Sequence, residues 1–271
     1  VGEEDLTGKP GQFLYVRCAE CGLVYQNPRL LLEQIKDFYD DDYILHRKKK
    51  NWGLLQPLFD RALSKLDVAK AKIVERYCRV EPETQVLDVG CAVGSFLMRL
   101  RQKKGCSITG VDFKDLTGYP GFDAIEFHCG LFYEQPIAPE RFDIVTMWHF
   151  LEHCYDPAQS LQMAKRVLKP TGRLFVEVPR LDSLSFKLFA ERWPGVQAPQ
   201  HTVLYDKAHL LSFVTQQGFR VIDYLPYGAF PDYFYLFAGT AFKFLKGRGL
   251  NLQKAMAPYF LGQVATSPLL L

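Results

Sequence analysis

An alternation of short apolar runs with helical stretches, beginning at residue 85, constrains the fold of this chain more than any other feature. The runs predict strands at 85–90, 107–113, 124–130, 141–148, 173–179 and 219–227. Helices are predicted between them at 95–105, 157–172 and 206–218. Strands and helices in alternation build βαβ units, in which helices cover both faces of a parallel sheet. The prediction is therefore an α/β fold with a mostly parallel sheet.

The segments outside this alternation have other patterns. A C-x-x-C pair lies among short predicted strands near the start, helical spacing of apolar residues follows, and the end of the chain is aromatic and apolar. We therefore expect a partial zinc-ribbon-like segment at 1–30, a helical cap at 31–80, an α/β domain at 81–228 and an aromatic helical lid or interface segment at 229–271.

Charge and cysteine content limit the functional class. Lysine and arginine exceed aspartate and glutamate by 33 − 30 = 3, and the basic run at 46–50 fits a solvated face, so we expect no nucleic-acid partner. The seven cysteines are odd in number, and most are scattered through predicted core elements. They indicate a reduced, cytoplasmic chain rather than a disulfide framework. We expect neither a signal peptide nor a membrane-spanning helix, because no matching apolar run is present.

The turn after the first predicted strand, "LDVGCAVGSF", carries small residues at alternate positions: Gly90, Ala92 and Gly94. Small residues let a backbone approach a ligand closely at the carboxyl end of a strand, where open α/β sheets bind their ligands. A dinucleotide fingerprint would need its third glycine where Ser95 stands, and here the acid Asp88 precedes the turn. A pyrophosphate disfavours that carboxylate, whereas a cationic ligand can use it.

The second predicted strand ends in Asp112, followed by Phe113. A carboxylate at this place can accept both hydroxyls of a ribose, and a phenyl ring can lie against an adenine. The pattern therefore favours a cationic, phosphate-free ligand with a ribose, a description that S-adenosylmethionine (SAM) fits. The alternative is an ordinary α/β turn without a ligand.

Residues 84–225 resemble class I SAM-dependent methyltransferases, most of all a group with a cysteine knuckle before the catalytic domain. The matching stretches are "VLDVGCAVGSF", "GVDF", "FDIVTMWHFLEHCYDP", "RVLKPTGRLFVEVP" and "APQHTVLYDKAHLLSFVTQQGF". The resemblance implies a Rossmann-like methyltransferase fold that binds SAM and releases S-adenosylhomocysteine. It also implies that Asp88, Gly90, Ala92 and Gly94 line the methionine side of SAM, and that Asp112 takes the ribose.

By the same resemblance, two further segments border the adenine and the sulfonium of SAM. They are Gly130–Leu131 and Met147–Trp148–His149. Many relatives carry an aspartate where this chain has Leu131, so adenine recognition here would rest on backbone groups or another side chain.

The string "HFLEH" also matches an H-x-x-E-H zinc-peptidase motif through His149, Glu152 and His153. That chemistry needs both histidines on one helical face, a third ligand and an open coordination position. His149 directly follows an apolar strand, so we expect a strand end and no catalytic metal. The candidates for a catalytic base are then His149, His153 and His201. For each of them, a loop-bracing or core role is the alternative.

The two ends of the chain leave questions open. Cys18 and Cys21 have the spacing of half a zinc knuckle, but four ligands are needed and no second pair is present. We therefore predict no bound metal. The aromatic C-terminal segment suits a lid over an apolar acceptor, a peripheral membrane contact, a homodimer interface or plain packing on the sheet.

Together these features predict a SAM-dependent methyltransferase that moves a methyl group to an oxygen, nitrogen or carbon atom of a small molecule. The aromatic C-terminus favours an apolar, lipid-like acceptor. The alternatives are a SAM-fold protein that binds without catalysing and, less favoured, a zinc hydrolase.

Overall fold

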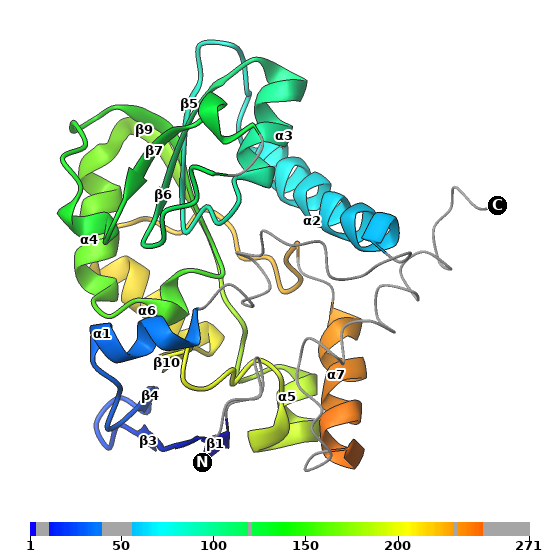
Figure 1. The fold of residues 1–271 in the computed structure, drawn as a ribbon. Helices are drawn as coiled ribbons and strands as arrows, with labels where there is room; N and C mark the ends of the chain where they lie inside the picture. Colours follow the sequence, from blue (N-terminus) through cyan, green and yellow to red (C-terminus); the bar gives the residue numbers. More distant parts are fainter. Residues whose placement is uncertain (4–10, 40–55, 119–120, 230–231, 246–271) are drawn as a thin grey trace. The chain divides into compact units, whose positions relative to one another are not determined.

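The computed structural model describes residues 1–3, 11–39, 56–118, 121–229 and 232–245 (Figure 1). The chain divides into two compact units. We call Ser64–Val178 with Leu211–Tyr224 the sheet unit, and Val1–Leu63, Pro179–Leu210 and Leu225–Leu271 the terminal unit. Each unit joins stretches that are far apart in sequence, and the predicted division into four consecutive segments stays a prediction. No helix among the described residues is long and apolar enough to span a bilayer.

The sheet unit is built on a five-stranded sheet with the strand order β7-β6-β5-β8-β9. Its strands are β5 (Gln85–Val89), β6 (Ser107–Asp112), β7 (Glu126–Cys129), β8 (Phe142–Trp148) and β9 (Leu168–Glu177). All neighbouring pairs are parallel. The predicted fold class is confirmed. The chain runs outward from β5 in both directions, which makes the carboxyl end of β5 the switch point where open sheets bind ligands.

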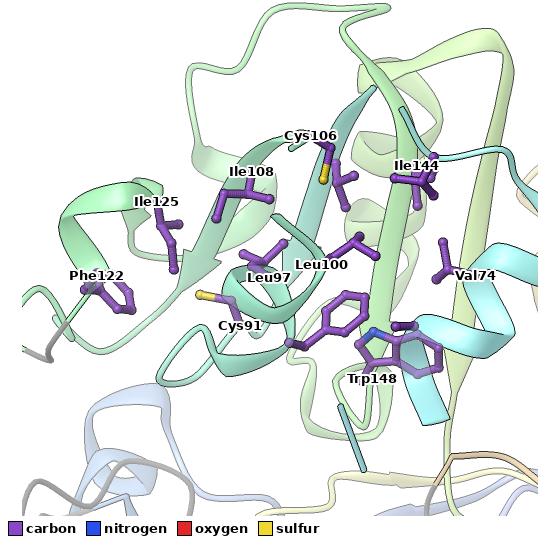
Figure 2. Close-up of a cluster of buried hydrophobic side chains, with 14 of the residues drawn as sticks. Val74, Cys91, Leu97, Leu100, Cys106, Ile108, Phe122, Ile125, Ile144 and Trp148 are labelled. Carbon is purple, nitrogen blue, oxygen red and sulfur yellow. The ribbon is translucent and has the colours of Figure 1, made fainter. Parts of the chain in front are cut away.

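Helices cover both faces of this sheet (Figure 1). On one side lie α3 (Ser95–Lys104) and the later part of α2 (Gln56–Tyr77), and on the other lies α4 (Pro157–Val167). Burial on both faces explains why the residues of β5 from Val86 to Val89 are all buried, rather than buried at alternate positions. The side chains of α2 and α3 meet those of β5, β6 and β8 in a single core (Figure 2).

The ends of these helices follow local rules. Asp156 caps α4 by accepting a hydrogen bond from the backbone N–H of Gln159 at 2.9 Å, and Pro157 occupies the first turn. Gly105 ends α3 with a left-handed backbone, φ +75°, as the sequence predicts. The helix predicted at 157–172, however, is shorter than expected, and Pro170 and Gly172 do not end it. That helix stops at Val167, and both residues lie within β9.

The sixth predicted strand is wrong. Residues 219–227 form no strand, and Val221 and Ile222 are exposed. Two hydrogen bonds hold this segment in place. At its start, the Phe219 N–H donates to the carbonyl of Val214, and further along the Tyr77 hydroxyl donates to Asp223. An apolar run becomes a strand only when it pairs with another strand, and none of the described strands pairs with this one.

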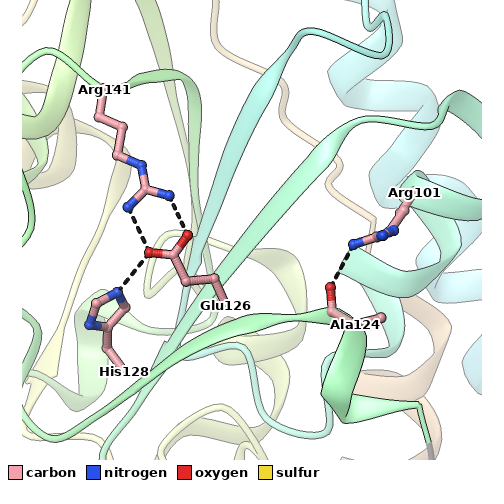
Figure 3. Close-up of polar contacts among 5 residues, drawn as sticks. All are labelled: Arg101, Ala124, Glu126, His128 and Arg141. Carbon is pink, nitrogen blue, oxygen red and sulfur yellow. Dashed lines mark hydrogen bonds and ion pairs between the residues drawn. The ribbon is translucent and has the colours of Figure 1, made fainter.

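The edge strand β7 is tied down at its amino end by polar contacts (Figure 3). Arg141 donates two hydrogen bonds to the carboxylate of Glu126, and His128 lies 3.3 Å from the same carboxylate. Arg101 of α3 donates to the carbonyl of Ala124 at 2.7 Å. These groups are partly exposed, so each contact contributes modestly. Together they fix the strand that leads to Gly130.

The terminal unit holds the remaining strands and the helices α1, α5 and α7. Its three-stranded antiparallel sheet has the order β10 (Val203–Leu204), β4 (Val24–Gln26) and β3 (Tyr15–Arg17), and β1 (Gly2–Glu3) pairs with β2 (Gln12–Phe13). The helices α5 (Leu184–Phe189) and α7 (Asp232–Leu245) contact each other. Trp193 is the centre of the core here, because its ring lies 5.6 Å from Phe186 and 5.3 Å from Tyr235. The start of the predicted helical cap is α1 (Leu32–Ile35) followed by a 3-10 turn, Lys36–Phe38.

Candidate functional site

The turn between β5 and α3 contains backbone conformations that favour glycine. Gly90 has φ +74° and Gly94 has φ +71°, and Ala92 between them has φ +48°. A Cβ atom at Gly90 would lie 2.8 Å from Cδ2 of Phe150, and one at Gly94 would lie 2.2 Å from Cδ1 of Ile125. The turn therefore needs glycine at both positions, for conformation and for space.

Asp112, at the end of β6, binds this turn from the neighbouring strand. Its Oδ2 accepts the backbone N–H of Ala92 at 3.0 Å, and its Oδ1 accepts that of Lys114 at 3.1 Å. The side chain is buried, which raises the pKa of the carboxyl group to about 6 against the pull of these hydrogen bonds. Phe113 follows at the same edge and is half-buried. Sequence and structure thus place Asp112 and the glycine turn together.

Asp88 lies inside β5, one strand away from Asp112, and is 3% exposed. Its Oδ1 accepts a hydrogen bond from the Thr146 hydroxyl of β8 at 2.6 Å. Burial raises the pKa of this carboxyl group to about 7, while nearby Lys70 acts in the opposite direction. Thr146 has no signal in the sequence, because a threonine within a strand is ordinary.

Lys70 of α2 brings a cation to the same region. Its Nζ lies 5.7 Å from the ring centre of Trp148 and 5.9 Å from that of Phe96, within cation–π range. The Trp148 indole is 7% exposed, and its N–H has no hydrogen-bond partner among the described residues. Figure 2 shows this ring at the edge of the core formed with α2 and α3. Lys70 was not predicted as a site residue, although a charged residue on the inner side of an amphipathic helix is a usable signal.

The third and fourth strands end at the same edge of the sheet. Gly130, φ +131°, donates its N–H to the carbonyl of Asp112 at 2.8 Å. The carbonyl of Leu131 accepts from the amide of Gln135 at 3.0 Å, and the Met147 side chain is fully buried in the core. All the predicted cofactor-binding residues therefore lie at or next to the carboxyl ends of β5 to β8, and their binding role stays a prediction.

His149, the first residue after β8, is held between two carboxylates. Its Nε2 lies 3.0 Å from Oε1 of Glu177, and its Nδ1 lies 3.3 Å from Oε1 of Glu152. Burial lowers the pKa of the imidazole, but the two carboxylates prevail and raise it to about 9. Glu177, at the end of β9, was not predicted as a site residue.

The zinc-peptidase alternative needs a helix that the structure does not contain. His149 has φ +52° and precedes a single 3-10 turn, Leu151–His153. The two histidines are therefore not four residues apart on one α-helical face. His153 is half-buried at the end of this turn.

His201 belongs to the terminal unit, where it is 3% exposed. Its Nδ1 lies 2.8 Å from the carbonyl of Gly195, and its own carbonyl accepts the hydroxyl of Tyr15 at 2.7 Å. These contacts show a bracing function within that unit. The base role predicted for His149, His153 and His201 stays a prediction.

Cys18 and Cys21 lie on the turn between β3 and β4. The carbonyl of Cys18 accepts the N–H of Gly22 at 3.0 Å, and backbone hydrogen bonds from Cys21 lower the pKa of the Cys18 thiol. His209 donates from Nε2 to the carbonyl of Cys21 at 2.7 Å and lies 2.8 Å from Asp206 through Nδ1. His209, which the sequence did not single out, thus supports the turn through Nε2, while Asp206 holds its other ring nitrogen.

A family model described as a methyltransferase domain matches residues 46–224, more than half of the chain. The ubiquinone biosynthesis O-methyltransferase of Aeromonas salmonicida is 33% identical over 100 residues, which cover 34% of this chain and 42% of that protein. The protein of the same name from Colwellia psychrerythraea is 28% identical over 156 residues, covering 52% and 63%. The chain thus spans less than two thirds of the length of either curated relative.

Among solved structures, phosphoethanolamine N-methyltransferase 2 of Haemonchus contortus, solved with S-adenosyl-L-methionine, matches with a TM-score of 0.51. The match covers 72% of this chain and 48% of that one at 17% sequence identity. Identity this low supports the fold alone. The fold and the extent of the family match lead to one conclusion: the chain belongs to the methyltransferase-domain family.

Proposed function

We propose that this chain is a SAM-dependent methyltransferase that acts on a small-molecule acceptor. The observation that carries the proposal is the pair of buried carboxylates, Asp88 and Asp112, on adjacent strands beside the glycine turn at the switch point of the sheet. Buried carboxylates with raised pKa values are expected where a cationic or hydroxyl-bearing ligand completes their environment.

The residues present fit SAM. Asp112 would accept the ribose hydroxyls, and Asp88 would face the ammonium side of the methionine moiety. The N–H of Trp148 has no hydrogen-bond partner in the part of the chain that the structure describes, and together with the Lys70 cation it is suited to a carboxylate. When bound, SAM supplies a methyl group that its sulfonium charge has already activated. The protein's own residues then align the partners and exclude water from the carboxyl end of the sheet.

The acceptor class follows from the relatives. Their names assign them O-methylation in ubiquinone biosynthesis, which supports an oxygen atom of an apolar molecule as the acceptor here. Nitrogen and carbon acceptors remain alternatives of the same class. A protein of this fold that binds SAM without turnover is the alternative of another class.

Calorimetric titration with SAM tests the cofactor assignment. The Asp112→Asn variant loses one of the two carboxylate oxygens that accept hydrogen bonds, so we expect SAM affinity to fall about tenfold or more, an effect of roughly 1–3 kcal/mol. Asp115→Asn is the matched control, because Asp115 is exposed and accepts hydrogen bonds within its own turn from Thr117. Equal losses in both variants, or none in either, would contradict the ribose assignment.

Turnover separates an enzyme from an inert binder. Wild-type protein incubated with SAM and apolar, hydroxyl-bearing acceptors should release S-adenosylhomocysteine, measured by mass spectrometry. Binding of SAM without release across oxygen, nitrogen and carbon acceptors would favour the non-catalytic alternative.

Two features of the terminal unit give narrower proposals. The spacing of Cys18 and Cys21 and the backbone hydrogen bond that closes their turn support half a cysteine knuckle, as in the family group that the sequence resembles. The helices α5 and α7 expose Leu184, Leu188 and Phe244, which supports a peripheral membrane contact that would give access to an apolar acceptor. A homodimer interface is the alternative use of that face.

A further inference from the structure

His149 stands at the carboxyl end of β8, where the sequence suggests a catalytic base. In the structure, however, both nitrogens of its ring already contact other side chains. Both ring nitrogens lie within 3.3 Å of a carboxylate oxygen, one from Glu152 and one from Glu177. A neutral imidazole has a single N–H, so it can donate to only one carboxylate. When both carboxylates are ionised, the arrangement is satisfied on both sides only by the doubly protonated imidazolium, which has no lone pair to accept a proton.

The backbone takes part in the same arrangement. The His149 N–H donates to the carbonyl of Glu177 at 2.8 Å, so β9 holds both the backbone and the ring of this residue. Its φ of +52° is a left-handed conformation that is strained for a residue with a side chain. Such a conformation persists only when neighbouring groups hold the residue in place. Here the carboxylates of Glu152 and Glu177 hold the ring of His149.

The residue after His149 connects this arrangement to the cofactor turn. Phe150 packs against Gly90, where an added Cβ would lie 2.8 Å from its Cδ2 atom. The position of the loop after β8 therefore sets how closely a phenyl ring supports the turn beneath the proposed SAM site.

We infer that His149 is a cationic positioning residue: clamped between Glu152 and Glu177, it joins the ends of β8 and β9 and sets Phe150 against Gly90. This inference rests in part on the proposed function, since the affinity that it tunes is that for the cofactor. The charged and titratable groups near the clamp in the described part of the sheet unit include Glu152, Glu177 and His153, whose ring lies within 4.8 Å of the Glu152 carboxylate. They also include the buried thiol of Cys154, which interacts with Glu152.

The charge state is tested without any ligand, by NMR titration of the His149 ring nitrogens. We expect the ring to stay doubly protonated through pH 8 and to lose its proton near pH 9, as the raised pKa indicates. Glu177→Gln removes one carboxylate and should move that titration down by at least one pH unit, about tenfold in proton affinity. A ring that titrates below pH 7 in the wild type would overturn the inference.

The positioning effect is tested by calorimetry with S-adenosylhomocysteine. At pH 7.5 we expect His149→Gln to bind about tenfold more weakly than the wild type, because its loop no longer sets Phe150. The difference should vanish above pH 9, where the wild-type ring has lost its charge. The matched control is His128→Gln, since His128 also lies 3.3 Å from a glutamate but at the amino end of β7.

The outcomes separate the two proposals. Wild-type protein that does not bind S-adenosylhomocysteine contradicts the proposed cofactor, and the ring titration then decides alone whether the clamp exists. Binding by the wild type with equal affinity in His149→Gln overturns the positioning role while leaving the cofactor assignment intact. Should His149→Gln fail to fold, Glu177→Gln takes its place in the calorimetry with the same expected direction.

Discussion

At the scale of single residues, the two buried acids beside the glycine turn lower the stability of the fold when they are charged. Asp88 and Asp112 are buried, and burial raises their pKa values to about 7 and about 6. A carboxyl group whose pKa is higher in the folded state stabilises the fold in its protonated form. That contribution is complete below pH 4 and is lost as pH rises through the folded pKa. At neutral pH and above, both groups therefore lower the stability of the ligand-free protein.

Asp88→Asn should remove the destabilising effect of the buried charge at this position. The amide oxygen of asparagine can still accept the hydrogen bond from Thr146, but no charge is buried. We expect the free energy of unfolding at pH 8 to rise by about 2 kcal/mol, with little change at pH 4, and cofactor affinity to fall. Chemical denaturation at the two pH values measures the first effect. An equal change at both would show that charge burial is not the cause.

The sequence places Asp88, Asp112 and the turn correctly at one edge of the sheet, because the ends of neighbouring parallel strands must meet. It does not identify Thr146, Lys70 or Glu177, whose relevance depends on contacts between elements far apart in the chain. His149 shows the same limit in another form. Its strand-end location is predictable, whereas its two carboxylate partners decide what the ring can do.

At the scale of elements, the turn between β5 and α3 should tolerate no side chain at Gly94. Gly94 and Gly105 flank α3 with nearly equal φ values, +71° and +75°. A Cβ at Gly94 would lie 2.2 Å from Ile125, while one at Gly105 would find its nearest neighbour, Pro82, at 3.7 Å. The two positions thus share conformational strain and differ in space.

We therefore expect Gly105→Ala to lower the free energy of unfolding by about 1 kcal/mol through strain alone. Gly94→Ala should cost about 3 kcal/mol or more, since overpacking adds to the same strain. Urea denaturation of the two variants measures the difference. Equal costs would show that Ile125 moves aside and that the turn is looser than the distances indicate.

The elements predicted from apolar runs hold for β5, β6, β7, β8 and β9, each of which pairs with at least one neighbour. The run at 219–227 has a similar composition but no partner strand, so its residues follow local contacts instead. The composition of a segment indicates that it tends to be buried. Whether it forms a strand depends on whether another segment of the chain pairs with it. The early start of β9 at Leu168 has the same origin, because Leu168 pairs with Phe142 across the sheet.

At the scale of the molecule, the fold class was predictable from the alternation of elements, and the division into two units was not. Both units combine stretches that are far apart in the chain. The pattern of residues along the sequence does not report contacts between such distant stretches. The terminal unit exposes Leu184 and Leu188 on α5 and Phe244 on α7, with Lys187 and Lys243 also exposed on these helices. Apolar side chains beside basic ones suit an anionic lipid surface.

Co-sedimentation with vesicles tests this surface. We expect the protein to sediment with vesicles that contain phosphatidylglycerol, and Leu188→Glu to reduce the bound fraction severalfold by placing a charge in the apolar contact. Leu31→Glu is the control, because Leu31 is also exposed but lies before α1. Analytical ultracentrifugation without lipid examines the alternative, since a dimer that Leu188→Glu dissociates would assign this face to a second copy.

The hydrogen bonds from Ala92 and Lys114 to Asp112 fix the shape of the turn through contacts within the protein itself. A molecule that arrives there meets a backbone whose conformational entropy has already been lost during folding. Its association should then require little rearrangement of the chain, so that displaced water, rather than a newly ordered loop, would dominate the entropy of binding.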